Sequence, residues 1–219
     1  SFRMPSNLQY IAPETFRNCE QLKTFYIGKA CRGKINYGEE GDPDTLFLYY
    51  APIRLIQIDK ENTSYQLQNE ILYTRDGHIL CQALKNDNAD SQLTIPSCVT
   101  EIADGAFYRN SEFGAIEVKG SLERIGISAF ACADVGSFYV KGGVNYLDRG
   151  SFYQSAISEW RCHGGVKKYE KSAFQDVDAT NGYAIDMNAI TKLYQELLYV
   201  NATTDLSYWV KTIWNWIIM

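Results

Sequence analysis

The sequence predicts an α/β fold, a right-handed leucine-rich-repeat solenoid that is rich in β-strand and has short helical turns on the far side. Two observations lead to this prediction. A phenylalanine that follows a small residue recurs every 22 or 23 positions, at Phe107, Phe130, Phe152 and Phe174. In each unit apolar residues precede it by five and eight positions, and a strand-like alternation follows it. Self-similarity at a fixed period of about 20 to 29 residues is typical of leucine-rich-repeat solenoids.

Each unit is expected to contain a strand whose residues point alternately into the core and into solvent. The inward pairs on successive strands are Ile116 and Val118, Phe138 and Val140, Trp160 and Cys162, and Tyr183 and Ile185. The chain then turns, crosses the core and returns through the phenylalanine. We therefore expect the four phenylalanines to stack in a row as core residues, not as ligand-binding residues.

A first unit of the same kind lies at the start of the chain. Its residues Pro5, Leu8, Ile11 and Phe16 have the spacing of Pro96, Val99, Ile102 and Phe107. Residues 28–44 then break the pattern with glycines and charged residues, as surface loops do. The repeat resumes in a degenerate form at Phe47.

Residues 60–92 are predicted to be an insertion that contains a β-hairpin. Two strand-like runs, 71–75 and 78–82, flank Asp76 and Gly77. An Asp-Gly pair between two such runs indicates a type I′ turn, which needs positive φ at both central residues. The solenoid with its insertion is thus expected to occupy residues 1–186.

Residues 187–219 change to a helical period, with Met187, Ile190, Leu193 and Leu197 on one face. Because the end of a solenoid exposes its core, this segment is predicted to be a cap packed on that end. Residues 206–219 contain three tryptophans and fit either a second helix or a final strand. A partner-binding apolar tail is the alternative.

Composition excludes several classes of function. The net charge is −5 and the basic residues form no block, which argues against a nucleic-acid partner. No apolar run approaches the roughly 18 residues that a membrane span needs. The chain opens on Ser1 without a signal peptide, as expected for a mature or trimmed protein. The six cysteines are expected to be small buried hydrophobes, with a disulfide at Cys31 as the open alternative.

No catalytic constellation is evident in the sequence. His78 follows a turn and is expected to be solvated, whereas strand alternation should point His163 and Cys162 to opposite faces. Motifs for zinc, nucleotide or serine-hydrolase chemistry are absent. Residues 39–44 contain four acidic side chains that could hold calcium, but their spacing favours a solvated loop. We therefore expect no enzyme activity, cofactor or metal.

The segment from Ser91 to Phe107 reads Ser-Gln-Leu-Thr-Ile-Pro-Ser-Cys-Val-Thr-Glu-Ile-Ala-Asp-Gly-Ala-Phe and resembles the BspA-like leucine-rich repeat. That repeat runs Ile-Pro, a gap, Val or Leu, Ile, then Ala-Phe. Residues 62–77 resemble a segment often inserted in this family, with Glu70 where glycine usually follows the asparagine. The resemblance covers about residues 2–186. It implies a secreted or cell-surface bacterial protein, outer-membrane anchoring included, of the binding or adhesion type.

Binding is expected at outward strand positions, which stack into columns on one face of the sheet. Tyr139 beside Arg161, with acidic residues nearby, combines aromatic area with charge as interface hot spots do. An ordinary solvated sheet face with cross-strand pairs is the alternative. The candidate binding residues are Tyr26, Gln57, Thr94, Glu117, Tyr139, Glu159 and Arg161.

Two functions follow from this face. The first is an extracellular or cell-surface interaction and adhesion module that binds a host matrix protein or another surface protein. The second is a carbohydrate-binding accessory protein of a bacterial surface system, in which exposed tyrosine and tryptophan rings stack on sugars.

Overall fold

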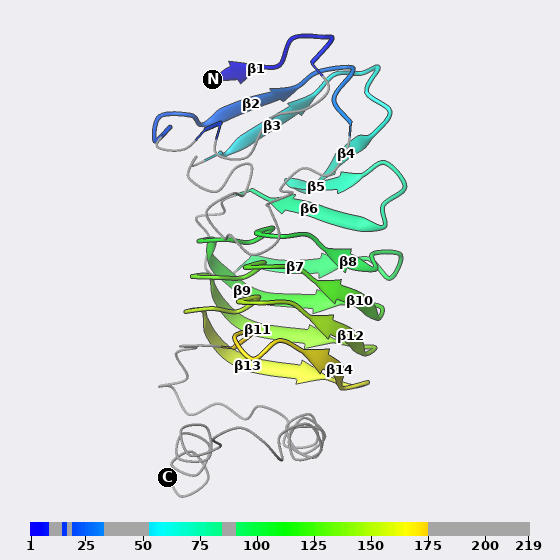
Figure 1. Ribbon diagram of the computed structural model, residues 1–219, viewed down its shortest axis with the longest axis vertical. Coiled ribbons are helices and arrows are strands. Elements are labelled where there is room, and N and C mark those ends of the chain that lie inside the picture. The colour runs from blue at the N-terminus through cyan, green and yellow to red at the C-terminus, as the bar shows by residue number, and fades with distance from the viewer. Residues whose placement is uncertain (9–14, 17–18, 33–52, 85–90, 175–219) are drawn as a thin grey trace, which may run out of the picture.

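The computed structural model describes residues 1–8, 15–16, 19–32, 53–84 and 91–174, which contain 14 strands in three sheets along one long axis (Figure 1). The N-terminal sheet is parallel throughout, and its strands are β1 (Phe2–Arg3), β2 (Thr24–Ile27) and β3 (Leu55–Ile58). The other two sheets run along the repeats. Within the described residues the structure has no helix that could cross a membrane.

Residues 91–174 coil as a regular β-solenoid, as the spacing of the phenylalanines predicts. Each coil gives one strand to a four-stranded sheet, whose members are β7 (Ser91–Ile95), β9 (Ser111–Val118), β11 (Asp134–Val140) and β13 (Ala156–Cys162). Its second strand joins a seven-stranded sheet, as β8 (Glu101–Ile102), β10 (Leu122–Ile125), β12 (Val144–Leu147) and β14 (Val166–Tyr169). Neighbouring coils pair in parallel at a register of one repeat, so that Val118, Val140 and Cys162 are successive partners.

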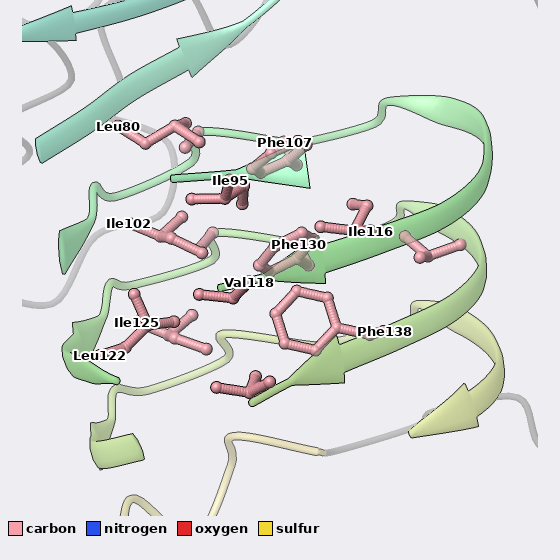
Figure 2. Close-up of a cluster of buried hydrophobic side chains, with 14 of the residues drawn as sticks. Leu80, Ile95, Ile102, Phe107, Ile116, Val118, Leu122, Ile125, Phe130 and Phe138 are labelled. Atoms are coloured by element: carbon pink, nitrogen blue, oxygen red, sulfur yellow. The ribbon is translucent and has the colours of Figure 1, made fainter. Parts of the chain in front are cut away.

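The predicted row of phenylalanines is present between the two strand layers. Successive ring centroids of Phe107, Phe130, Phe152 and Phe174 lie 4.6, 4.9 and 5.2 Å apart, with interplanar angles below 10°. Figure 2 shows Phe107 and Phe130 pointing into the core beside Ile102 and Ile116. The rings of Phe138 on β11 and Trp160 on β13 form a second stack beside the four-stranded sheet, with centroids 4.9 Å apart. We call the buried cluster around these rings the repeat core.

The turns that carry the phenylalanines are not the short helices expected from the sequence, and no described residue is helical. The phenylalanine N–H groups donate to the next coil instead of their own turn, for example Phe107 to the Ala129 carbonyl and Phe130 to the Ser151 carbonyl, both at 2.7 Å. Left-handed residues also stand two positions before and two after the ring, and they interrupt helical geometry. They are Gly105, Ser128 and Gly150 before it, and Arg109, Cys132 and Gln154 after it.

The insertion contains the expected hairpin and one further strand. Its strands β4 (Tyr65–Gln68), β5 (Ile71–Thr74) and β6 (Ile79–Ala83) pair antiparallel in order. A type I′ turn at Asp76 and Gly77 was the wrong assignment, because only Gly77 has positive φ (77°) and its N–H donates to the Thr74 carbonyl at 2.9 Å. Positive φ at both central residues occurs one turn earlier, at Asn69 (48°) and Glu70 (62°).

This insertion separates two hydrophobic cores and contributes side chains to both. On one of its faces Ile71, Tyr73, Leu80 and Ala83 belong to the repeat core. On the other, Tyr65, Leu72, Cys81 and Leu84 belong to a second cluster with Phe16 and Phe25, which we call the N-terminal core. Strand β6 pairs in parallel with β8, so the insertion also extends the seven-stranded sheet. Burial on both faces explains why these strands read as unbroken apolar runs and not as alternating ones.

Several expectations fall on residues outside the described ranges. These are Ile11, the degenerate unit at Phe47, the acidic loop at 39–44, the strand pair Tyr183 and Ile185, and the segment 187–219. The cap and the division of the chain at residue 186 therefore stay predictions.

Candidate binding face

Four of the seven candidate residues form one column on the four-stranded sheet. Thr94, Glu117, Tyr139 and Arg161 are successive Cα partners across β7, β9, β11 and β13. Their neighbours along the strands are buried, apart from the partly buried Leu93, so these side chains lie on the outer side. Glu159 stands two residues before Arg161 and closes a second column of small or polar residues, with Gln92, Ala115 and Ser137. We call the two columns together the binding face.

Tyr26 and Gln57 lie elsewhere. They are partners of each other in the N-terminal sheet, which shares no strand with the four-stranded sheet. The sequence suggested one continuous column through Tyr26, Gln57, Thr94, Glu117, Tyr139 and Arg161, with Glu159 in a second column, whereas the structure divides these residues between two sheets.

Charged side chains on the binding face are paired with one another. The Glu117 carboxylate accepts from Lys119, which directly follows β9, at 2.5 Å and lies 3.5 Å from Lys141 on the next coil. The hydrogen bond from Lys119 is the main reason that the pKa of Glu117 is lowered. Arg161 forms an ion pair with Glu159, yet 60% of its side chain stays exposed. The guanidinium is thus oriented without being hidden.

Tyr139 is held in place by His163, which follows β13. The Tyr139 hydroxyl lies 2.9 Å from His163 Nε2, and the two rings meet edge to face at a centroid distance of 5.2 Å. His163 is exposed, whereas Cys162 beside it is buried and donates to the Gly165 carbonyl at 3.3 Å. Burial also raises the pKa of the Cys162 thiol. These two residues therefore do not form a nucleophile and base, as strand alternation predicted.

On the N-terminal sheet Tyr26 is fixed from two sides. Its hydroxyl donates to Asp59 at 2.8 Å, and the Arg3 guanidinium lies 3.9 Å from the centre of its ring. The hydrogen bond to Asp59 is the main reason that the pKa of Tyr26 is raised. Leu55, which neighbours Gln57 on β3, is 46% exposed.

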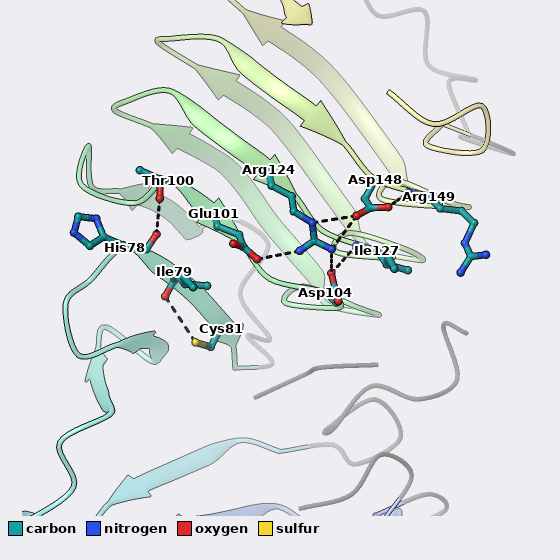
Figure 3. Close-up of polar contacts among 10 residues, drawn as sticks. All are labelled: His78, Ile79, Cys81, Thr100, Glu101, Asp104, Arg124, Ile127, Asp148 and Arg149. Atoms are coloured by element: carbon teal, nitrogen blue, oxygen red, sulfur yellow. Dashed lines mark hydrogen bonds and ion pairs between the residues drawn. The ribbon is translucent and has the colours of Figure 1, made fainter. Parts of the chain in front are cut away.

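A polar cluster around Arg124 lies on the seven-stranded sheet (Figure 3) and was not predicted from the sequence. Arg124 donates to Glu101 at 2.9 Å, to Asp104 at 2.5 Å and to Asp148 at 2.8 and 3.0 Å. Asp104 also accepts from the Ile127 N–H at 2.9 Å, and burial raises its pKa although Arg124 opposes the shift. The sequence contains a signal for this cluster, because the two residues between the apolar ends of β10, β12 and β14 also recur once per repeat.

All six cysteines are free, so the alternative of a disulfide at Cys31 does not hold. Cys31, Cys81 and Cys162 are buried as expected, whereas Cys98 is exposed and Cys19 and Cys132 are only partly buried. Burial of Cys31 in the N-terminal core raises the pKa of its thiol to about 11. His78 is exposed, as expected, and its Nδ1 lies 2.9 Å from the Cys98 carbonyl oxygen. In the described ranges no three acidic, histidine or cysteine side chains gather as a metal site.

Comparison with known proteins agrees with this geometry. A family model described as the BspA type leucine-rich repeat region matches residues 1–37 and 77–181 in six copies. No curated protein matches the chain. The fold is similar to the crystal structure of the pneumococcal vaccine antigen PcpA, with 14% identity, a TM-score of 0.50, and 78% of this chain and 53% of that one covered.

A leucine-rich repeat protein from Eubacterium ventriosum ATCC 27560 is also similar, with 14% identity, a TM-score of 0.31, and 71% of this chain and 59% of that one covered. The chain thus spans little more than half the length of either solved structure.

Proposed function

The chain belongs to the BspA-type leucine-rich repeat family, and from this premise we propose that it is a non-catalytic interaction module, secreted or on the cell surface, that adheres to a protein partner. The partner is a host matrix protein or another surface protein. It docks on the binding face of the four-stranded sheet, with Tyr139 and Arg161 as its centre.

The observation that carries this proposal is the fixed orientation of Tyr139. Its hydroxyl and ring are both engaged by His163, and its strand partner Arg161 is oriented by Glu159. Aromatic and arginine side chains supply much of the binding energy at protein interfaces. Because these two are already ordered, a partner that contacts them loses little side-chain entropy on binding.

The test is a double variant, Tyr139→Ala with Arg161→Glu, measured against a panel of matrix and surface proteins by biolayer interferometry. We expect binding to the partner found for the unaltered protein to fall at least tenfold, which corresponds to about 1.4 kcal/mol. Thermal stability should change little, since cross-strand pairs on a solvated face contribute less than about 1 kcal/mol. Intact binding by the folded variant would remove this face from consideration.

A matched control uses the same residue types away from the face. Tyr153 and Arg149 lie in one turn between β12 and β13, and Arg149 is exposed. The pair Tyr153→Ala with Arg149→Glu should leave partner binding unchanged.

Carbohydrate binding is the second candidate, because Tyr139 lies amid hydrogen-bonding side chains of the kind that sugars contact. One observation weakens it on the N-terminal sheet, where Arg3 occupies a face of the Tyr26 ring that a sugar would need. A glycan array probed with the unaltered protein and the Tyr139→Ala variant discriminates the two. Carbohydrate binding would be favoured if the unaltered protein bound a glycan, the variant lost this signal, and no protein in the panel bound.

A further inference from the structure

The charge on the outer side of the seven-stranded sheet changes from negative to positive along the stack of coils. Between the inward-facing end residues of β10, β12 and β14, which are buried except for the partly buried Tyr169, two residues per strand lie on the outside. One column runs Glu101, Arg124, Tyr146 and Lys168 as Cα partners. The adjoining column runs Glu123, Asn145 and Lys167, and the Asn145 amide donates to the Glu123 carboxylate.

Its β8 and β10 side is acidic. Glu101 on β8, Asp104 after it and Asp148 after β12 surround the single guanidinium of Arg124, and Glu123 on β10 adds an exposed carboxylate. On the β8 and β10 side alone, three carboxylates against one guanidinium leave an excess of two negative charges.

Its β14 side is basic. Lys167 and Lys168 are both exposed, and neither side chain makes a hydrogen bond or ion pair with another residue that the structure describes. Lys171 is exposed on the following turn. The nearby carboxylate of Glu170 accepts a hydrogen bond from the Tyr146 hydroxyl at 2.5 Å. Tyr146 and Asn145 on β12 thus separate an acidic half from a basic half.

We propose that this face docks on the same face of a second copy of the chain, with a two-fold axis passing at β12. A two-fold interface is self-complementary, because each patch meets its counterpart by rotation. Rotation about β12 brings Glu123 of one copy opposite Lys167 of the other, and Arg124 with its surrounding carboxylates opposite Lys168, twice. Asn145 and Tyr146 then meet at the centre, where an aromatic side chain is most valuable. No other partner is needed to balance the two halves.

The dimer is weak and depends on salt. Four strands spaced about 4.8 Å apart make a contact well below the roughly 800 Å² per partner of a stable complex. Attraction between exposed charges weakens as salt is added, because the Debye length falls from about 10 Å at 0.1 M to about 3 Å at 1 M ionic strength. The four-stranded sheet stays free, so a dimer carries two binding faces and gains avidity for a surface with repeated ligands.

Sedimentation velocity on the full chain tests the proposal from about 10 to 500 μM, a range suited to weak association, at low and high salt. At low salt the weight-average mass should rise toward that of a dimer, and at about 0.5 M salt it should return to that of a monomer. Glu123→Lys alone, and Lys167→Glu with Lys168→Glu, should each weaken self-association about tenfold or more through like-charge contacts.

An equimolar mixture of these two variants carries the decisive result. Both two-fold contacts in the mixed pair join opposite charges, so the mixture should associate as the unaltered protein does. Lys23→Glu with Lys60→Glu is the matched control, since both lysines are exposed near the N-terminal sheet, and it should associate normally. A monomer at every concentration and salt, or a mixture that stays monomeric, would overturn the proposal.

Discussion

The two cores on either side of the insertion are built in different ways from the same kinds of residue. In the repeat core the phenylalanine rings of successive coils are nearly parallel, because identical turns place them in identical orientations. In the N-terminal core Phe16 meets Phe2 and Phe25 edge to face, at 63° and 82°, while Phe2 and Phe25 stack at 26°. These three rings differ in orientation, whereas the row of the repeat core keeps one ring orientation from coil to coil.

Polar anchoring differs as well. The buried Asn62 bonds the N-terminal core together, since its amide donates to the carbonyls of Gly28 and Cys31 and its oxygen accepts from the N–H groups of Ser64 and Tyr65. In the repeat core the coils are joined by backbone hydrogen bonds at every turn. Stability is therefore spread over many equivalent contacts in one core and concentrated in a few particular residues in the other.

The largest expected effect comes from the centre of the phenylalanine row. Phe130 is fully buried between the rings of Phe107 and Phe152, which backbone hydrogen bonds hold in place. Phe130→Ala leaves a cavity that its neighbours cannot fill, and we expect it to lower the free energy of unfolding by about 3–5 kcal/mol in urea titrations. Phe174→Ala, at the partly exposed end of the row, should cost less. Equal costs would show that the row is not a cooperative stack.

Asn62→Ala should be next in size and should act on one core alone. It removes four hydrogen bonds, although the Gly28 carbonyl keeps a partner in the Cys31 N–H, and we expect a loss of about 3 kcal/mol. Hydrogen exchange should accelerate at Tyr65 and Cys31 while Phe130 and Phe152 stay protected. Uniform acceleration through both cores would mean that they unfold as one unit.

Ser151→Ala should stabilise the protein. The Ser151 hydroxyl is the one buried side-chain oxygen or nitrogen in the described part that lacks a hydrogen bond, and it occupies the position that alanine holds at Ala106 and Ala129. Removing an unsatisfied buried hydroxyl should raise the free energy of unfolding by about 1.5 kcal/mol.

The matched control for this change is Ser155→Ala four residues later. The buried Ser155 hydroxyl donates to the Phe152 carbonyl at 2.7 Å, so its loss should destabilise the protein by about 1 kcal/mol. If both changes had the same sign, the hydrogen bonding of the two hydroxyls would not be what decides stability.

The same contrast explains what the sequence could predict. Phe107 to Phe174 recur at a fixed period, so their row follows from spacing alone, and so do the columns that place Tyr139 beside Arg161. The double role of Leu72 and Tyr73 could not be assigned from one strand, because adjacent apolar residues show burial on both faces without saying which core each one joins. Arg124 was missed because alternation was applied to one strand of each coil and not to the other.

The turn between β4 and β5 offers the smallest effect. Asp76-Gly77 has the composition of a type I′ turn, but the two consecutive left-handed residues are Asn69 and Glu70. The turn at Asn69 and Glu70 sets the register of β4 against β5, in which Leu72 and Tyr73 point to opposite cores. A left-handed conformation costs a residue with a side chain about 1 kcal/mol relative to glycine. Glu70→Gly should therefore raise the free energy of unfolding by about 1 kcal/mol in chemical denaturation, whereas Gly77→Ala should lower it, since Gly77 is left-handed too. A loss of stability in Glu70→Gly would mean that contacts of the glutamate side chain stabilise this turn and the insertion between the two cores.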